Sequence, residues 1–260
     1  MSRRRLDVEL VERGLAGSEE ESRRLVEGRR VVVAGAPAIN PNMLVARGVD
    51  IRVEQPRRFA SRGGDKLEAA LTDLGVSAMG KRCLDVGAGS GGFTDCLLQR
   101  GAAEVVAIDV GYGQFDWRLR RDPRVRLLER MNVRTIPPAE LGEGYEVVVA
   151  DLSFISLVAV LDRLAEAAAS GADMVLLVKP QFEAARDQVE QGGLVRDSQV
   201  WQETIARVVH ALARRGFGTD RIVAARPRGA RGNQEFFLRA RRDLPTSDPG
   251  PLMRTALQTA

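Results

Sequence analysis

The sequence of 260 residues contains a single histidine and only two cysteines, which restricts the chemistry that it can support. Cys83 and Cys96 are too few for a disulfide framework or a cysteine-ligated zinc site, and His210 alone excludes most histidine-based metal sites. We therefore predict no metal centre. So low a cysteine content also fits a reducing compartment such as the cytoplasm.

Long hydrophobic runs are absent as well. No apolar stretch approaches the roughly 20 residues that a membrane-spanning helix needs, so we predict no membrane partner. The first residues become acidic and amphipathic without an apolar core of a signal peptide, so we expect no secretory signal. These two features together favour a cytoplasmic protein.

Lysine is rare in a chain that is otherwise rich in basic residues. Of 39 lysines and arginines, only Lys66, Lys81 and Lys179 are lysines, and the formal net charge is +4. A basic balance suits a polyanionic partner such as nucleic acid, although a bias towards arginine could also arise without function. Arginine cannot replace a lysine that must titrate, which makes the three lysines candidates for a catalytic role.

The chain divides into several segments by pattern. Residues 1–55 resemble two short helices followed by a small β element, with a capping box at Ser18–Glu21 and strands at Val31–Val33 and Ile51–Val53. Residues 56–64 are basic and contain proline and glycine, which predicts a linker. Residues 65–242 form the main domain. Residues 243–260, rich in proline and polar residues, are expected to be a disordered tail.

Within the main domain apolar strands alternate with helices, which predicts an α/β fold with a mostly parallel sheet covered on both faces. The expected strands are 82–86, 105–109, 125–128, 146–151, 174–179, 221–225 and 235–240. The expected helices are 93–100, 157–169 and 199–215, after a first amphipathic helix that begins near Lys66 and stops at Gly75.

A glycine-rich loop follows the first strand of this domain. The residues from Gly87 to Gly92 include the spacing G-x-G-x-x-G, which alone is a weak signal for a nucleotide. Asp85 precedes the loop, where its carboxylate could pair with a ligand ammonium but would repel a pyrophosphate. Asp109 ends the next strand, where it could accept hydrogen bonds from ribose hydroxyls. This combination favours S-adenosylmethionine over NAD or a ligand-free turn.

Two further polar residues follow apolar strands of the same sheet. Asp151 and Lys179 each come directly after such a strand, at the edge where ligands bind in this architecture. A desolvated lysine at that position is a candidate general base. The alternatives are that Asp151 caps a helix and that Lys179 extends its ammonium to solvent.

Lys66, Asp151, Lys179 and Glu235, in this order, resemble the K-D-K-E tetrad of FtsJ-like RNA ribose 2′-O-methyltransferases. The chain apart from its tail is similar to the TlyA (hemolysin A) family, and residues 1–55 resemble the S4 RNA-binding domain. The blocks that carry this resemblance are Ser61–Leu67, Asp85–Asp95, Asp109–Gln114, Asn132–Arg134, Asp151–Ser156, Val178–Glu183 and Gly232–Glu235. The chain departs from the family at Gly89-Ser90, where Ser-Thr is usual, and at Phe59, where tyrosine or tryptophan is expected.

The resemblance implies a Rossmann-like methyltransferase domain that uses S-adenosylmethionine and acts on a ribose 2′-hydroxyl, with cytidine as the expected nucleoside. Lys179 would accept the hydroxyl proton, Asp151 and Lys66 would align the reacting groups, and Glu235 would balance their charge. The implied partners are ribosomal RNA or ribosomal subunits. The cofactor-binding candidates are Asp85, Gly87, Ala88, Gly89, Gly91, Gly92, Phe93, Asp109, Asn132 and Asp151. The RNA-binding candidates are Arg4, Arg23, Arg24, Arg29, Arg30, Arg58, Arg62, Arg228 and Arg231.

Two other classes of function remain open on the sequence alone. A ribosome assembly factor could keep the shape of a methyltransferase without turnover, although the complete tetrad argues against it. A membrane-active hemolysin would need an amphipathic or spanning segment, and the sequence offers none of sufficient length.

Overall fold

The computed structural model describes residues 3–54, 58–245 and 247–258. The chain separates into two compact units, residues 1–57 and 58–260, each of which is described by itself. In the first unit α1 (Leu6–Glu12) and α2 (Glu19–Glu27) pack on two small antiparallel sheets. These sheets pair β1 (Arg3–Arg5) with β4 (Leu44–Ala46), and β2 (Val31–Val33) with β3 (Ala36–Pro37) and β5 (Ile51–Val53).

The small unit has a core of its own. Leu6, Leu10, Val26 and Val31 are completely buried in a separate apolar cluster. The Ser18 hydroxyl accepts a hydrogen bond from the Glu21 backbone N–H at 3.1 Å, so Ser18 caps α2 as expected. The expected capping box is only half formed, because the Glu21 carboxylate accepts from the Gly17 N–H and not from Ser18. The strands β1, β3 and β4 were not expected. β1 consists of three arginines, which give no apolar strand pattern, and Ala36–Pro37 of β3 has the composition of a turn.

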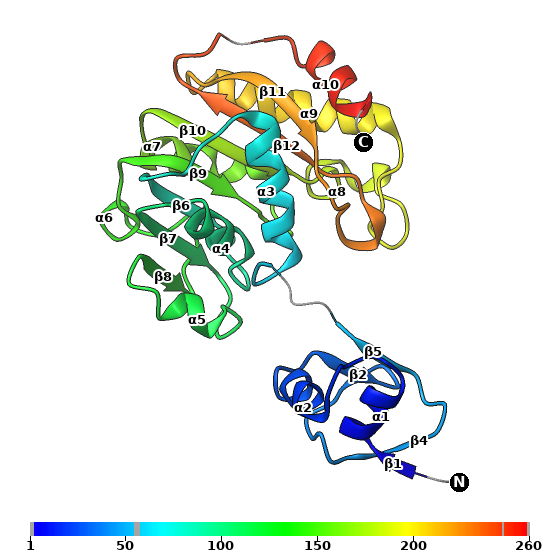
Figure 1. The fold of residues 1–260 in the computed structure, drawn as a ribbon. Helices are drawn as coiled ribbons and strands as arrows, with labels where there is room; N and C mark the ends of the chain where they lie inside the picture. Colours follow the sequence, from blue (N-terminus) through cyan, green and yellow to red (C-terminus); the bar gives the residue numbers. More distant parts are fainter. Residues whose placement is uncertain (1–2, 55–57, 246, 259–260) are drawn as a thin grey trace. The chain divides into compact units, whose positions relative to one another are not determined.

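The second unit is built on a seven-stranded sheet in the order β11-β12-β10-β9-β6-β7-β8 (Figure 1). Its strands are β6 (Arg82–Val86), β7 (Glu104–Asp109), β8 (Val125–Glu129), β9 (Tyr145–Ala150), β10 (Ala168–Val178), β11 (Gly218–Ala224) and β12 (Phe236–Arg241). The neighbours from β8 to β10 are parallel, and β12 runs antiparallel to β10 and β11. All seven expected strands are therefore present.

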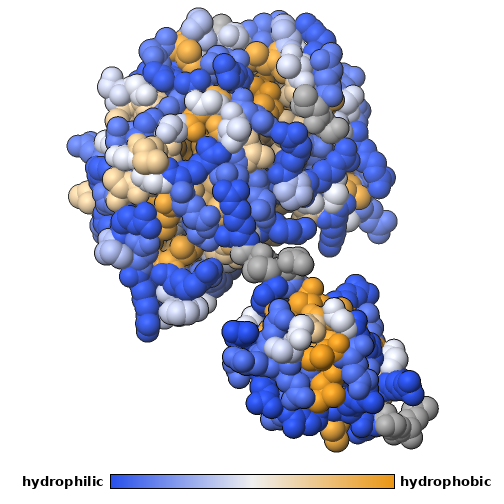
Figure 2. Space-filling model, in the orientation of Figure 1, coloured by the Kyte–Doolittle hydropathy of each residue, from blue (hydrophilic) through white to orange (hydrophobic). Residues whose placement is uncertain are grey.

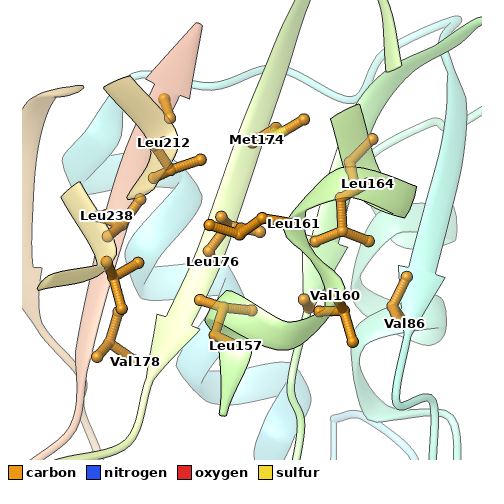
Figure 3. Close-up of a cluster of buried hydrophobic side chains, with 14 of the residues drawn as sticks. Val86, Leu157, Val160, Leu161, Leu164, Met174, Leu176, Val178, Leu212 and Leu238 are labelled. Carbon is orange, nitrogen blue, oxygen red and sulfur yellow. The ribbon is translucent and has the colours of Figure 1, made fainter. Parts of the chain in front are cut away.

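Alternating residues of the strands bury opposite faces of this sheet. On one face, Met174 and Leu176 of β10 join a cluster under η1 (Leu157–Val160), α7 (Leu161–Ala167) and α9 (Ser198–Ala213), which Figure 3 shows in part. On the other face α3 (Arg62–Leu74) and α4 (Gly92–Gln99) pack over a second cluster. Both faces are covered, which is why the central strands contain continuous apolar runs such as Val147–Ala150.

The remaining short elements are α5 (Trp117–Arg120), α6 (Pro138–Leu141), α8 (Pro180–Glu183), η2 (Arg186–Gln188) and η3 (Ala230–Gly232).

The predicted linker, residues 56–64, is wrong at its end, and its first two residues lie outside the described part of the chain. Arg62, Gly63 and Gly64 form the first turn of α3, whose N-cap is Ser61. A β-carbon on Gly64 would lie 2.3 Å from the β-carbon of Phe59, which is itself 2% exposed. Glycine is thus needed at position 64 because the packed Phe59 side chain leaves no room for a β-carbon. It does not interrupt the helix.

The expected disordered tail is also wrong. Residues 249–258 form α10 (Pro249–Gln258), which packs against α9 and β11 (Figure 1). Met253 and Ala256 are each about 1% exposed and belong to the core cluster of the sheet. Burial of these side chains stabilises a helix whose proline-rich start gave no local helical signal.

Candidate functional site

The glycine loop between β6 and α4 is held tightly against its neighbours. Gly87, Gly89 and Gly91 all have positive φ angles, of 87°, 54° and 92°. A β-carbon on Gly87 would lie 2.3 Å from the Asp151 carbonyl oxygen, and one on Gly91 would lie 2.5 Å from Leu119. Glycine is therefore required at Gly87 and Gly91 both by backbone conformation and by contact.

A cavity of about 670 Å³ opens at this loop. Its wall contains residues from the carboxyl ends of β6, β7, β9 and β10 and the loops that follow them, including Gly87, Ala88, Gly89, Asp109, Asn132, Asp151 and Lys179. This is the edge of a parallel sheet at which ligands bind in open α/β folds. The volume lies within the roughly 300–1,000 Å³ of ligand pockets.

Asp109 is fixed at the lip of the cavity. Its two carboxylate oxygens accept hydrogen bonds from the backbone N–H groups of Gly89, at 2.8 Å, and Gly111, at 2.6 Å. The carboxylate is thus oriented in advance, and each oxygen retains a lone pair for a further donor such as a hydroxyl group.

Asp85 has a different position from the one expected. Its side chain is completely buried under the loop and is not part of the cavity wall, and Thr94 donates a hydrogen bond of 2.6 Å to it. Burial raises the pKa of Asp85 to about 7, since the hydrogen bond from Thr94 offsets only part of the lost solvation. Asp85 thus makes a structural contact between β6 and α4 through one carboxylate oxygen, while its Oδ1 atom has no hydrogen-bond partner among the described residues. Its contact with a ligand ammonium stays a prediction.

Lys179 and Asp151 form an ion pair at the cavity. The Lys179 Nζ atom lies 2.5 Å from Asp151 Oδ1, and it also donates a hydrogen bond of 3.1 Å to Ser153 Oγ. The side chains of Lys179 and Asp151 are 12% and 25% exposed, so a ligand in the cavity can reach both groups. Asp151 follows β9 and Lys179 follows β10, which are adjacent parallel strands.

Lys66 and Glu235 form the second pair, at 2.6 Å, with side chains 12% and 3% exposed. Glu235 directly precedes β12, whose Phe236 is paired with Val178 of β10, so the backbone register sets Glu235 opposite Lys179. Gln181 connects the two pairs, because its amide donates a 3.2 Å hydrogen bond to Glu235 and it lies two residues after Lys179. A β-carbon on Gly229 would meet the Glu235 carboxylate at 2.2 Å, so a side chain there is excluded.

The predicted site residues thus divide into two groups. The cavity wall includes Gly87, Ala88, Gly89, Asp109, Asn132, Asp151 and Lys179. Asp85, Gly91, Gly92 and Phe93 lie behind this wall, and Gly92 contacts Ser61, the N-cap of α3. These four residues fix the conformation of the loop without lining the cavity.

The predicted RNA-binding arginines of the first unit are largely exposed, and several have acidic neighbours. Arg4 pairs with Glu9 and Glu12, Arg23 with Asp7 and Glu19, and Arg24 with Glu20. Arg29 is exposed, and Arg30 donates to the Glu54 carbonyl oxygen at 2.9 Å. The pairs Arg4–Glu12 and Arg24–Glu20 are exposed on both sides, and such pairs are weak and screened by salt, so phosphates can compete for these guanidinium groups. The carboxylates of Asp7 and Glu9 are buried, so Arg23 and Arg4 are held more firmly there.

The predicted arginines of the second unit lie on two segments. Arg58 pairs with Glu68 at 2.9 Å, and Arg62 is exposed at the start of α3. Arg228 and Arg231 are exposed on the loop before Glu235, and Arg231 donates a hydrogen bond to the Gly192 carbonyl oxygen. The face of the molecule drawn in Figure 2 is hydrophilic over most of its surface, with smaller apolar patches.

Several residues of the site were not expected. Ser153 and Phe154 belong to the cavity wall, and Phe154 is 92% exposed with a φ of 64°. Its ring centroid lies 5.2 Å from that of Phe182. The side chain of Gln181 bridges to Glu235, as described above. The signal available was the position of these residues, one to three places after Asp151 or Lys179 in the sequence.

Within residues 3–54, 58–245 and 247–258, histidine, cysteine, aspartate and glutamate form no cluster of three or more that could hold a metal ion. Over these same ranges, none of the helices combines the length and the apolar character needed to cross a bilayer.

Comparison with known proteins matches both units to families. Residues 59–242 match the FtsJ-like methyltransferase family, and residues 4–51 match the S4 domain. A Mycobacterium tuberculosis protein named 16S/23S rRNA (cytidine-2′-O)-methyltransferase TlyA is 45% identical over 92% of this chain and 90% of its own length. Hemolysin A of Brachyspira hyodysenteriae is 34% identical over 90% of this chain and 98% of its own.

A solved structure of a hemolysin-like protein from Streptococcus thermophilus agrees with these matches. It superimposes with a TM-score of 0.75 at 36% identity, covering 99% of this chain and 96% of the other. The strand order, the glycine loop and the two lysine–carboxylate pairs described above lie within the matched regions. The chain therefore belongs to the TlyA family, in which an S4 domain precedes an FtsJ-like methyltransferase domain.

Proposed function

We propose that this protein transfers a methyl group from S-adenosylmethionine to the ribose 2′-hydroxyl of a cytidine in ribosomal RNA. The observation that carries the proposal is the placement of the Lys179–Asp151 pair in the wall of the 670 Å³ cavity. The Lys66–Glu235 pair lies outside that wall and is joined to the Lys179 segment through the hydrogen bond from Gln181 to Glu235. The nucleoside and the type of RNA are taken from the names of relatives such as the Mycobacterium tuberculosis protein.

The cavity suits S-adenosylmethionine in size and in donors and acceptors. Gly87 and Gly89 leave room for the ligand beside the end of β6, and the fixed carboxylate of Asp109 would accept hydrogen bonds from its ribose hydroxyls. The Asn132 side chain lies on the wall as well. When bound, the cofactor supplies a methyl group that the positive sulfonium already activates for transfer.

Lys179 is the residue that would take the proton from the target hydroxyl. It would act from its neutral form, with the amine in the cavity wall and within reach of a hydroxyl there. Asp151, at 2.5 Å, holds the Lys179 side chain in place and stabilises the ammonium that forms when the proton arrives. Because the methyl group is already activated, most of the rate gain would come from alignment of the two reactants.

Lys66 and Glu235 would support this pair from the β12 side of the sheet. The Glu235 carboxylate compensates the charge of Lys66 and accepts a hydrogen bond from Gln181 on the Lys179 segment. Removal of either charge would leave a mostly buried partner unpaired, which is unfavourable. Lys66 and Glu235 would therefore help to hold the target ribose and the Lys179 segment in register.

Two surfaces are available for RNA. The exposed arginines of the S4 unit, such as Arg24 and Arg29, would contact phosphates of a structured RNA. Arg228 and Arg231, near Glu235 in the sequence, would contact the strand that carries the target nucleotide. The exposed Phe154 ring at the cavity offers a face on which an unpaired base can stack. Such a substrate places the working protein in the cytoplasm with the ribosome.

A radioactive methyl-transfer assay tests the proposal. Purified protein, tritiated S-adenosylmethionine and ribosomal subunits should give labelled RNA, and Lys179→Arg should lower the rate by about 100-fold or more, because a guanidinium does not act as a base. Lys81→Arg is the matched control, since Lys81 pairs with Asp173 at 3.6 Å and is absent from the cavity wall. A wild-type rate in Lys179→Arg would disprove the assigned base. A wild-type protein that binds subunits but transfers no methyl group would contradict the proposed activity.

A further inference from the structure

Glu183 joins the two loops that carry Asp151 and Lys179. It is the last residue of α8, four positions after Lys179, and its side chain turns back to the start of η1. There the Ser156 hydroxyl donates to one carboxylate oxygen and the Leu157 backbone N–H donates to the other, each at 2.6 Å. Ser156 lies five positions after Asp151, so one carboxylate connects both loops.

The hydrogen bond from Leu157 is buried, and the one from Ser156 is partly buried. Glu183 is 6% exposed, and Leu157 is 2% exposed. Burial raises the pKa of the Glu183 carboxyl, while the hydrogen bonds from Ser156 and Leu157 lower it. A buried carboxylate with two donors is strongly constrained in position, because loss of either hydrogen bond leaves an unsatisfied group out of reach of water.

Both ends of the connection are fixed in their own elements. The Ser156 hydroxyl also accepts from the Val158 N–H at 3.2 Å and so caps η1, which continues directly into α7. On the other side, Arg207 of α9 donates to the Glu183 carbonyl oxygen at 2.5 Å. Glu183 is thus held between two helices of one sheet face.

Besides the Lys179–Asp151 ion pair itself, two other contacts span the same loops, and both are more accessible to solvent than the Glu183 carboxylate. One is the hydrogen bond from Lys179 to Ser153, and the other is the packing of the Phe154 ring, which is 92% exposed, against Phe182. Exposed contacts exchange readily with water and hold a loop less firmly. The buried Glu183 carboxylate is therefore the firmest of these three connections.

We propose that Glu183 is a positioning residue, which sets the separation of Asp151 and Lys179 through its hydrogen bonds to Ser156 and Leu157. It does not touch the cavity, so it acts on the reaction through the two residues that do. The inference rests on the proposed methyl transfer and extends it to a residue outside the tetrad. Misplacement of a catalytic group by about 1 Å can reduce a rate by about 100-fold.

The test compares Glu183→Ala, Glu183→Gln and Ser156→Ala in the full-length protein. Glu183→Ala should lower kcat about tenfold or more, with KM for S-adenosylmethionine and RNA changed less than about threefold, because the glycine loop and Asp109 do not contact Glu183. Glu183→Gln should recover most of kcat, since an amide can still accept from Leu157 and donate to Ser156. Ser156→Ala, which removes one of the two donors, should give an intermediate kcat.

Asp173→Asn is the matched control for a structural effect. Asp173 is also buried, at 5% exposure, and pairs with Arg239 at 2.8 Å, but it lies in the middle of β10, six positions before Lys179, and is not part of the cavity wall. This variant should lower the melting temperature and leave kcat unchanged. Thermal melts and calorimetric binding of S-adenosylmethionine show whether each variant is folded.

Three outcomes would overturn the inference. They are a folded Glu183→Ala with wild-type kcat, a Glu183→Gln that is no better than Glu183→Ala, and a loss of kcat in Asp173→Asn equal to that in Glu183→Ala. If Glu183→Ala fails to fold, the Ser156→Ala and Glu183→Gln results decide. Each of these outcomes leaves wild-type methyl transfer intact, whereas failure of the proposed function would remove transfer from the wild-type protein itself.

Discussion

Lys66 and Glu235 are 169 positions apart in the sequence, yet their charged groups meet at 2.6 Å between the start of α3 and the start of β12. Glu235→Gln should reduce methyl transfer about tenfold or more and destabilise the protein by about 1–3 kcal/mol, because the Lys66 ammonium loses its buried counter-charge. Denaturant unfolding measures the free energy, and the transfer assay measures the rate.

A double-mutant cycle with Lys66→Gln separates the pair from its surroundings. Each single variant should lower the free energy of unfolding by more than half as much as the double variant does, since the first substitution already leaves a partner unpaired. Strictly additive losses would mean that Lys66 and Glu235 act independently.

Asp109→Ala should weaken binding of S-adenosylmethionine by about tenfold or more, because the cavity loses a carboxylate that is oriented for hydroxyl donors. Isothermal titration calorimetry gives the affinity directly. Asp162→Asn is the control, as Asp162 pairs with Arg215 on the surface, away from the cavity wall. Equal affinities in Asp109→Ala and the wild type would place the cofactor ribose elsewhere.

Gly87→Ala and Gly80→Ala separate backbone strain from contact. Both glycines have positive φ, at 87° and 71°, but a β-carbon on Gly80 meets no atom within 4 Å, whereas one on Gly87 would overlap the Asp151 carbonyl. Gly80→Ala should lower the free energy of unfolding by about 1–2 kcal/mol, from backbone strain alone. Gly87→Ala should lower the free energy of unfolding by about 1–3 kcal/mol more than Gly80→Ala does, and it should abolish cofactor binding. Chemical unfolding measures the two free energies, and calorimetry measures cofactor binding. Equal losses of unfolding free energy in the two variants would contradict the overlap with the Asp151 carbonyl.

Asp85 makes the stability depend on pH in a defined direction. Burial raises its pKa to about 7, so between about pH 4 and about pH 7 the folded protein binds a proton that the unfolded chain has released. This contribution to stability is fully present below about pH 4 and is lost as the pH rises towards 7, by at most about 1.4 kcal/mol per pH unit. Asp85→Asn should remove this slope. A slope identical to that of the wild type would mean that Asp85 is ionised in the folded state.

The sequence predicted the main sheet well because its central strands are buried on both faces and contain continuous apolar runs, as in Val105–Ile108 and Val147–Ala150. The acids and lysines that follow the strands were found for the same reason, since parallel strands end at one edge. The tail was missed because α10 depends on the burial of Met253 and Ala256 against distant elements. Tertiary contacts of this kind leave no local pattern.

Burial also explains the errors at the site. Asp85 has the position of a ligand-binding acid in the sequence, but no local pattern reveals that its side chain lies under the glycine loop beside Thr94. Glu183 has no distinguishing neighbour in the sequence, and its role depends on contacts to Ser156, 27 positions away. Gly64 was interpreted as a helix breaker, although it allows Phe59 to pack against α3.

The account is tested most directly by locating the methyl group on the RNA. Ribosomal subunits methylated by the purified protein should be digested with nucleases, and the fragments sequenced by tandem mass spectrometry. The added methyl group should lie on the ribose of a cytidine, and it should be absent from subunits treated with Lys179→Arg. A methyl group on a base, or one that Lys179→Arg installs as well as the wild type, would contradict ribose methylation by the Lys179–Asp151 pair.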